Sequence, residues 1–284
     1  MAVRFGLAFP WGATINALAD ADPLLLAGAA AANLLSLTAK GSAWYPLLRR
    51  IGGARPGTTQ AATLVAAAVN SITVAGSGEA VRAQLVHDKD GIPYRSALAS
   101  LVATRLAEAL GLLIFLALAL LLTRPRLGTG AVAGGMLVLA AAAVASSRLL
   151  PTRKWHPSIA GLAPGRRLGW TAPVLLGSVN WAAQWTAYHW SLESTHLAIT
   201  PAASLTALLA ANFSGLLRLT PGNFGILQGS IVLGLDAFRI PAAQALAAGL
   251  ALQAVQVLPV LALALGMVGA GGFRQLASQR AGRV

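Results

Sequence analysis

Four charged residues stand in apolar surroundings as two pairs with the same spacing. Glu79 and Arg82 lie three residues apart, and Arg105 and Glu108 repeat that spacing. Residues three apart share one face of a helix, so Arg82 is the nearest candidate partner for Glu79. Ionisable side chains at membrane depth are costly and indicate a functional site by default. We expect the four to form a polar cluster inside a helix bundle; ion pairs that only hold helices together are the alternative.

Arg218 is the most suggestive single residue. It follows an uncharged run, residues 194–217, and directly precedes the sequence Leu-Thr-Pro-Gly-Asn-Phe-Gly. A guanidinium offers two parallel donors to a phosphate or carboxylate. The helix expected after Gly225 would add backbone N–H groups that favour an anion. The alternative is that Arg218 extends to the membrane surface without a ligand.

Two segments combine apolar composition with helix-breaking residues. They are residues 70–86 and 212–235, and an asparagine, Asn70 or Asn212, stands at the start of each. The predicted helix-break residues are Gly76, Gly78, Pro221, Gly222 and Gly225. Paired interruptions in the two halves of a chain indicate a transporter-like site and an internal pseudo-repeat, because non-helical backbone at membrane depth must be buried in protein or line a wet cavity. Ordinary loops or kinks between packed helices are the alternative.

The elements that position these residues are predicted from composition. The chain has 284 residues, of which 56% are hydrophobic and only 10% charged, with a mean hydropathy of +0.69. Five windows contain no Asp, Glu, Lys or Arg: residues 56–78, 127–147, 168–192, 194–217 and 240–273. Residues 106–123 form a sixth, interrupted only by Glu108. About 20 such residues cross a bilayer as a helix, and these windows lack the polar face of a soluble helix.

The sequence therefore predicts an all-α, polytopic membrane protein. We expect about seven transmembrane helices plus one or two re-entrant or broken segments, of which residues 74–95 are the main candidate. A single membrane domain would cover residues 1–284, with a first half at about 1–125, a second at about 126–273 and a basic tail at 274–284.

The net charge of +13 comes from cations that flank apolar helices, which indicates topology rather than nucleic-acid binding. We expect the basic loops and the C-terminus to face the cytoplasm, in the plasma (inner) membrane, where basic residues attract anionic lipids. No cleaved signal peptide is predicted.

Catalytic and metal chemistry find little support in the sequence. The chain has no cysteine, which excludes a thiolate metal site, and its four histidines are scattered without metal-ligand spacing. No Ser-His-Asp arrangement, phosphate-binding loop or pair of catalytic carboxylates can be identified. We therefore predict no catalytic residue, no metal and no cofactor, and we expect a protein that is not an enzyme.

The same segments resemble a known family. "AGSGEAVRAQLV", "ALASLVATRLAEALGLL" and "LTPGNFGILQGSIVLGL" resemble the signatures of the lysylphosphatidylglycerol synthase transmembrane-region, or flippase-like, family. The matching residues are Gly78, Glu79, Arg82, Arg105, Pro221, Gly222 and Gly225. The departures are Val74 and Ala75 where the family often has proline, Asn223 for a glycine, Gln228 for a glutamate, and Glu108 for an aspartate.

The resemblance implies lipid translocation or the handling of lipid carriers. Our leading hypothesis is a flippase-like protein whose cavity binds an anionic phospholipid, an aminoacyl phospholipid or a polyprenyl-phosphate-linked intermediate. The expected cavity residues are Glu79, Arg82, Arg105, Glu108, Arg218, Gln228, Asn70 and Asn212. The alternatives are an accessory membrane subunit of a glycosyl- or acyltransferase and a small-solute transporter. A homo-oligomer or a transferase partner is compatible with these hypotheses, and the soluble synthase domain of some relatives is not expected here.

Overall fold

The computed structural model describes residues 11–73, 77–123, 170–214 and 220–281, and every regular element in these ranges is helical. The elements are α2 (Trp11–Ala19), α3 (Pro23–Arg49), α4 (Pro56–Ile72), α5 (Ser77–Asp90), α6 (Tyr94–Thr123), α8 (Thr171–Glu193), α9 (Pro201–Ser214), the 3-10 turn η3 (Pro221–Asn223), α10 (Ile226–Asp236) and α11 (Ala242–Ala281). The predicted all-α membrane protein is confirmed.

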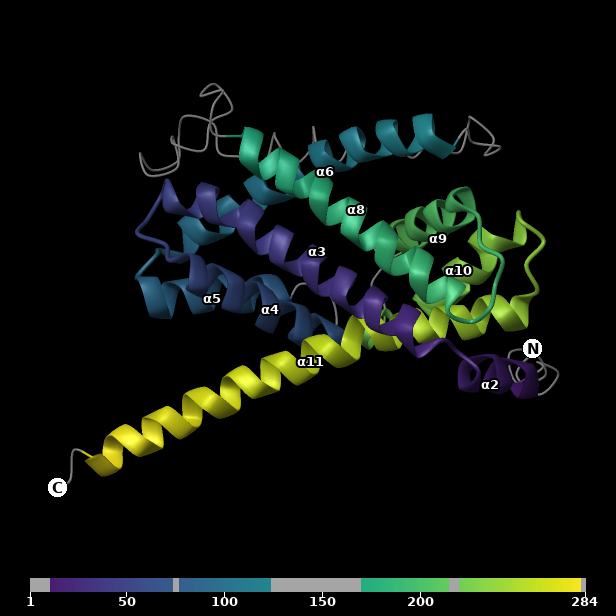
Figure 1. Ribbon diagram of the computed structural model, residues 1–284. Coiled ribbons are helices and arrows are strands. Elements are labelled where there is room, and N and C mark those ends of the chain that lie inside the picture. The colour runs from purple at the N-terminus through teal and green to yellow at the C-terminus, as the bar shows by residue number, and fades with distance from the viewer. Residues whose placement is uncertain (1–10, 74–76, 124–169, 215–219, 282–284) are drawn as a thin grey trace.

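Within the described ranges, three helices are long and apolar enough to cross a membrane: Pro23–Arg49, Tyr94–Ala117 and Ala242–Met267. A fourth helix, α8, has 23 residues and runs antiparallel beside α3 through the centre of the molecule (Figure 1). The backbone N–H of Asp22, before α3, donates to the Ser194 carbonyl after α8. At the opposite end, Leu47 of α3 packs near Trp170, which precedes α8.

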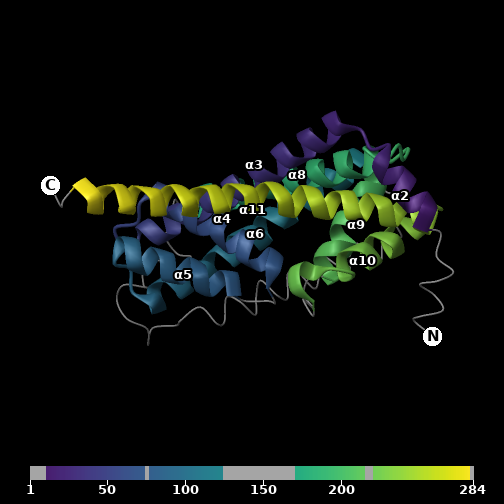
Figure 2. The same ribbon diagram turned by 90° about the horizontal axis from the view of Figure 1, so that it is seen from below.

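Helix α11 is the longest described element and continues past the body of the molecule (Figures 1 and 2). It contains Pro259, which has no N–H to donate to the carbonyl of Val255, four residues earlier. Asn33 of α3 donates to that carbonyl at 3.4 Å. A carbonyl without a hydrogen-bond partner is costly in an apolar interior. Asn33 therefore supplies the hydrogen bond that Pro259 cannot make, and it holds α3 against α11.

Helices α4 and α5 form a hairpin, so that the start of α4 and the end of α5 lie at the same end of the molecule. Arg55, before α4, pairs with Asp90, the last residue of α5, with 2.7 Å between Nε and Oδ1. Near the turn, the Gly78 N–H donates to the Asn70 side-chain oxygen at 3.0 Å. The arms have 17 and 14 residues, or about 26 and 21 Å, which is short of the roughly 30 Å of the bilayer core. The candidate re-entrant segment, residues 74–95, thus includes α5 of this hairpin; that the hairpin is re-entrant in a membrane stays a prediction.

Helices α9 and α10, joined through η3, form a second hairpin. Their arms have 14 and 11 residues and pack closely, because a Cβ on Gly234 would lie 3.2 Å from Ala210 Cβ. Figures 1 and 2 show this hairpin at the opposite end of the molecule from α4 and α5. The uncharged windows 56–78 and 194–217 therefore contain the hairpin arms α4 and α9. The count of seven spans stays a prediction, since residues 124–169 lie outside the described ranges.

The two hairpin tips meet inside the molecule. The Gly222 N–H donates to the Thr73 carbonyl at 3.3 Å. Gly222 has a φ of +59°, and a Cβ there would overlap the Ser71 carbonyl oxygen. Only glycine combines this backbone conformation with so close an approach. The contact gives the two breaks a common role in apolar sequence: the backbone of each tip packs against the other, while the neighbouring side chains of Ile72 and Phe224 stay exposed.

The order long helix, hairpin, long helix occurs twice, in opposite directions. Helix α3 is antiparallel to α6, because Lys40 meets Glu108 while Trp44 meets Ser100. Helix α8 is likewise antiparallel to α3. Helix α11 runs parallel to α3, because its start contacts Thr14 of α2, which precedes α3, and its middle packs with Leu34 and Leu37 of α3. Units α3–α6 and α8–α11 therefore have inverted topology, the arrangement that the paired breaks predicted.

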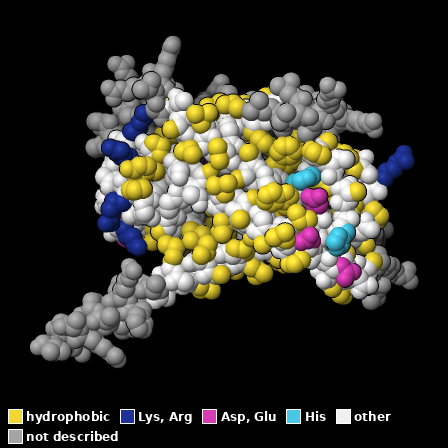
Figure 3. Space-filling model, viewed as in Figure 1, with side chains coloured by type: hydrophobic (Ala, Val, Ile, Leu, Met, Phe, Trp, Pro, Cys, Tyr) yellow, Lys and Arg dark blue, Asp and Glu magenta, His cyan; other side chains and the backbone are white. Residues whose placement is uncertain are grey.

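Charged side chains separate between the two ends of the molecule (Figure 3). Most described Lys and Arg gather where α3 ends and α4 and α6 begin, including Arg49, Arg50, Arg55 and Arg95. The other end has Asp22, Glu193, His196 and Asp236, with Arg239 as a basic exception, whereas His87, Asp88 and Asp90 of α5 lie at the basic end.

Candidate functional site

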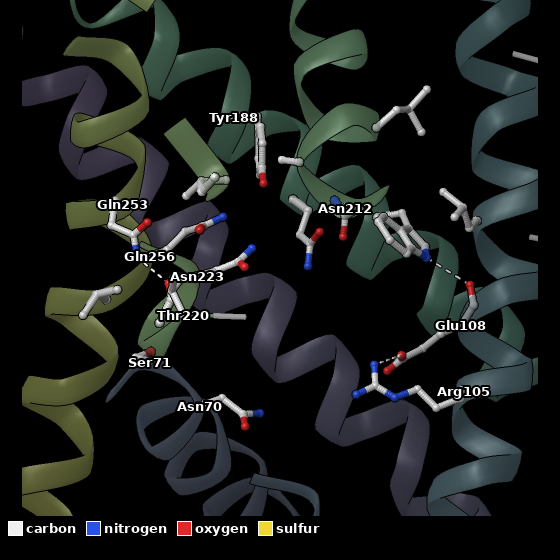
Figure 4. Close-up of a pocket in the computed structure, with 18 of the residues that line it drawn as sticks. Asn70, Ser71, Arg105, Glu108, Tyr188, Asn212, Thr220, Asn223, Gln253 and Gln256 are labelled. Atoms are coloured by element: carbon white, nitrogen blue, oxygen red, sulfur yellow. Dashed lines mark hydrogen bonds and ion pairs between the residues drawn. The ribbon is translucent and has the colours of Figure 1, made fainter. Parts of the chain in front are cut away.

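A cavity of about 440 Å³ lies where the two hairpin tips face α6, α8 and α11 (Figure 4). Its volume falls in the usual range for ligand sites, about 300–1,000 Å³. The hairpins contribute Asn70, Ser71, Thr73, Asn212, Thr220 and Asn223. The long helices contribute Arg105, Glu108, Gln184, Tyr188, Gln253 and Gln256.

The cavity lies near the middle of the predicted membrane. Arg105 is eleven residues after Tyr94, at the start of α6, and Gln253 is eleven residues after Ala242, at the start of α11. Both are therefore about 17 Å along their helices, near half of a hydrocarbon core of roughly 30 Å. The two helices enter from opposite ends, so both positions indicate the same depth.

Arg105 is the centre of the charged cluster. Its Nη1 lies 3.2 Å from Glu108 Oε2, and its Nη2 pairs with Glu79 of α5. Lys40 of α3 lies 3.5 Å from the other Glu108 oxygen. Three helices thus supply one ion-pair network, and pairing of this kind makes buried charge tolerable. The predicted polar cluster is present, and Lys40 is an addition to it.

Arg82 does not pair with Glu79 as the spacing suggested. Its Nη2 donates to Thr63 Oγ1 at 3.2 Å, and its guanidinium carbon lies 4.3 Å from the centre of the Trp44 ring. The Trp44 N–H in turn donates to Ser100 at 2.8 Å. The i,i+3 prediction was wrong because packing against α3 and α4 gives Arg82 an aromatic face, while Glu79 meets α6 instead.

The cluster retains a positive charge. Among the described residues, the two cations and two carboxylates of the ion-pair network balance, and Arg82, stacked on Trp44 beside it, brings the net charge of the cluster to +1. The Arg105 side chain is 42% exposed, whereas that of Glu108 is 7% exposed. A guanidinium has five N–H donors, and the two carboxylates are joined to two of its nitrogens. Arg105 can therefore still donate into the cavity.

Gln228 lies behind the cavity wall. Its Oε1 accepts from the Gly225 N–H at 2.8 Å, so it caps the start of α10. Its Nε2 contacts Gln253 Oε1 at 3.4 Å, and Gln253 donates to the Gly222 carbonyl at 2.9 Å. A neutral amide performs this capping and bridging without a charge. It also occupies a backbone N–H that we expected to be available to an anion.

The predicted site residues divide into three groups. Those that line the cavity are Asn70, Arg105, Glu108, Asn212 and Gly222. Those that lie behind its wall or beside it are Gly78, Glu79, Arg82, Gly225 and Gln228. Pro221 begins η3, and Gly76 and Arg218 lie outside the described residues. Gly78 is the second residue of α5 and not a break; a Cβ there would lie 2.6 Å from the Ala66 carbonyl oxygen.

Several residues of the cavity and of its ion-pair network were missed from the sequence. Lys40 is the one charge within residues 23–48, and Gln253 and Gln256 lie three apart in an uncharged run. Each is thus a polar residue in an apolar window, a signal that could have been used. Gln184 and Tyr188 are also polar residues in an uncharged window, and they lie one helical turn apart on α8. Their convergence with the tips could not be seen without the fold.

The sequence pattern of the family described as "Lysylphosphatidylglycerol synthase TM region" matches residues 2–264. A stretch of 97 residues is 35% identical to the glycosyltransferase AglD of Haloferax volcanii. That match covers 34% of this chain and 16% of AglD.

Proposed function

Because this chain belongs to the lysylphosphatidylglycerol synthase TM region family, we propose that it binds an anionic lipid in the cavity between the hairpin tips and translocates its headgroup. The headgroup would occupy the polar cavity while the lipid tails stay in the bilayer. The observation that carries this proposal is the position of Arg105, a partly exposed cation of a net-positive cluster at mid-membrane depth.

The energetic problem of translocation is the apolar core. An anion at the bilayer centre costs several kcal/mol unless it is solvated or paired. Arg105 and the surrounding amides would replace water at this depth, and a guanidinium matches the fork of a phosphate. The proposed action is therefore to lower the barrier at its highest point, without covalent chemistry.

The inverted units supply a route for alternating access. In transporters of inverted topology, one unit rocks against the other around a fixed central site. Here the tips join the units through the bond between Gly222 and Thr73. Separation of that contact on one side of the cavity would open it to one leaflet. We propose that the basic end faces the cytoplasm, in the plasma membrane, because cytoplasmic loops favour Lys and Arg.

The test is lipid movement in vesicles that contain the purified full chain and a fluorescent anionic lipid. Arg105→Gln should slow movement by about 10- to 100-fold, the equivalent of a charged hydrogen bond of roughly 1.5–3 kcal/mol. Arg95→Gln is the matched control, because Arg95 is exposed near the start of the same helix. Arg105→Lys keeps the charge and should retain partial activity.

Equal rates for Arg105→Gln and the unchanged protein, with thermal melting showing that both are folded, would contradict the proposal.

A second candidate function follows from the similarity to AglD: a membrane partner of a glycosyltransferase. In that case the purified chain would not move lipid alone, and activity would appear only after a transferase is added.

A further inference from the structure

We infer that the headgroup recognised in this cavity is a sugar joined to its lipid through phosphate, so that the ligand class is a glycosyl-phosphate lipid. This inference rests on the proposed lipid site and specifies its substrate. The wall of the cavity contains few charges and many carboxamides.

Carboxamides dominate the polar surface of the cavity. Three asparagines and three glutamines line it: Asn70, Asn212, Asn223, Gln184, Gln253 and Gln256. An amide offers two N–H donors and an acceptor oxygen. A sugar hydroxyl is also both donor and acceptor, so a wall of amides can satisfy several hydroxyls whatever the direction of each O–H.

Part of this hydrogen-bonding capacity is unused. Within the described ranges, the Asn223 oxygen is buried without a partner, and Gln184 makes no side-chain hydrogen bond to another described residue. Asn212 donates to the Leu208 carbonyl at 2.8 Å, which leaves its oxygen available. A buried polar atom without a partner costs about 1–3 kcal/mol. A hydroxyl-rich ligand would supply the missing partners.

Three of the lining amides lie across the cavity from its charged groups. Figure 4 shows Arg105 and Glu108 together on one side, with Asn223, Gln253 and Gln256 across the space from them. The ligand that fits has a phosphate toward Arg105 and a neutral, hydroxylated group toward the amides. A bare phospholipid would leave the amide side unused.

A cationic aminoacyl headgroup fits less well. Among the described lining residues Glu108 is the one carboxylate, and it is paired with both Lys40 and Arg105. An ammonium group would meet a cluster with a net charge of +1 and find neutral amides elsewhere. Like charges in an apolar interior repel strongly because the local dielectric constant is low. The charge of the cavity therefore favours the sugar.

The test measures equilibrium binding to the detergent-solubilised full chain. The probes are a radiolabelled short-chain prenyl phosphate, the same compound carrying a hexose on its phosphate, and lysylphosphatidylglycerol as competitor. The hexosyl form should bind about tenfold more tightly than the sugar-free form, and the lysyl lipid should compete poorly. In Gln184→Leu the ratio of the two affinities should fall by about three- to tenfold, as expected for one lost hydrogen bond.

A second variant and a control protect the result from folding artefacts. Asn223→Gly removes an amide while keeping the backbone, because the φ of +59° at this position suits glycine; the ratio should fall here too. Gln244→Leu, exposed at the start of α11, should keep the ratio. Equal binding of the two prenyl phosphates, preference for the lysyl lipid, or an unchanged ratio in both cavity variants would overturn the inference.

Transport distinguishes this inference from the proposed function. Hexosyl preference in binding without movement in vesicles would contradict translocation but keep the ligand class. Movement of sugar-free lipid with no hexosyl preference would keep translocation and overturn the ligand class.

Discussion

The contact between the hairpin tips gives the sharpest stability prediction. Gly222→Ala places a Cβ against backbone, not against a flexible side chain: it would overlap the Ser71 carbonyl oxygen and lie 3.2 Å from the Ser71 carbonyl carbon. Side-chain rotation cannot relieve such a clash. The tips must move apart, or the backbone of Gly222 must leave its φ of +59°.

The expected cost can be estimated from two contributions. A left-handed conformation costs an L-residue roughly 1–2 kcal/mol. Separation of the tips also weakens the 3.3 Å hydrogen bond from Gly222 to Thr73, for about 1 kcal/mol. The sum of about 2–3 kcal/mol corresponds to a fall of roughly 4–12 °C in melting temperature for a chain of this size. Lipid movement should fall as well, because Gly222 lines the cavity.

Thermal unfolding of the purified protein in detergent measures the effect. Gly229→Ala is the matched control: a Cβ on Gly229 of α10 meets nothing within 4 Å, and alanine is the better helix former. Its melting temperature should be unchanged or higher. If Gly222→Ala melts with the unchanged protein, the tips are not in the close contact described, and the architecture of the cavity is wrong.

Two further predictions concern the ends of the molecule. Partial burial acts to raise the pKa of Asp90, but hydrogen bonds from Arg55 and Thr58 outweigh it and lower that pKa; Asp90→Asn should therefore lower the melting temperature at neutral pH, and the difference should shrink as the pH falls below about 4. A difference that persists in acid would show that the carboxylate charge is not the cause. Because the chain has no cysteine, Arg50→Cys and Glu193→Cys can be labelled singly, and an impermeant maleimide should reach them from opposite sides of the membrane. Labelling of both from one side would exclude the proposed crossing of α3 and α8.

Much of the architecture could be predicted from local sequence. Uncharged windows of about 20 residues predict membrane helices because transfer to lipid depends mainly on composition. The breaks near Gly78 and Gly222 were found because Gly and Pro are conspicuous in apolar sequence. The charges of Glu79, Arg105 and Glu108 were found for the same reason.

The partners of those charges could not be predicted. Spacing favoured Arg82 for Glu79, but Arg105 lies 26 residues away and is brought to Glu79 by the packing of α5 on α6. Lys40 reaches Glu108 from a third helix. Local spacing gives only neighbours on the same helix, whereas a carboxylate pairs with the cation that packing places nearest.

The sequence by itself determined the class of protein, the presence of charges within apolar segments and the positions of its two interruptions, because each depends on the composition of a short segment. The tertiary structure alone decided that the interruptions are hairpin tips that meet, that the two units run in opposite directions, and that amides from five elements share one cavity with Arg105. These features depend on contacts between residues about 150 positions apart, such as Thr73 and Gly222. Such contacts arise only when the helices pack together.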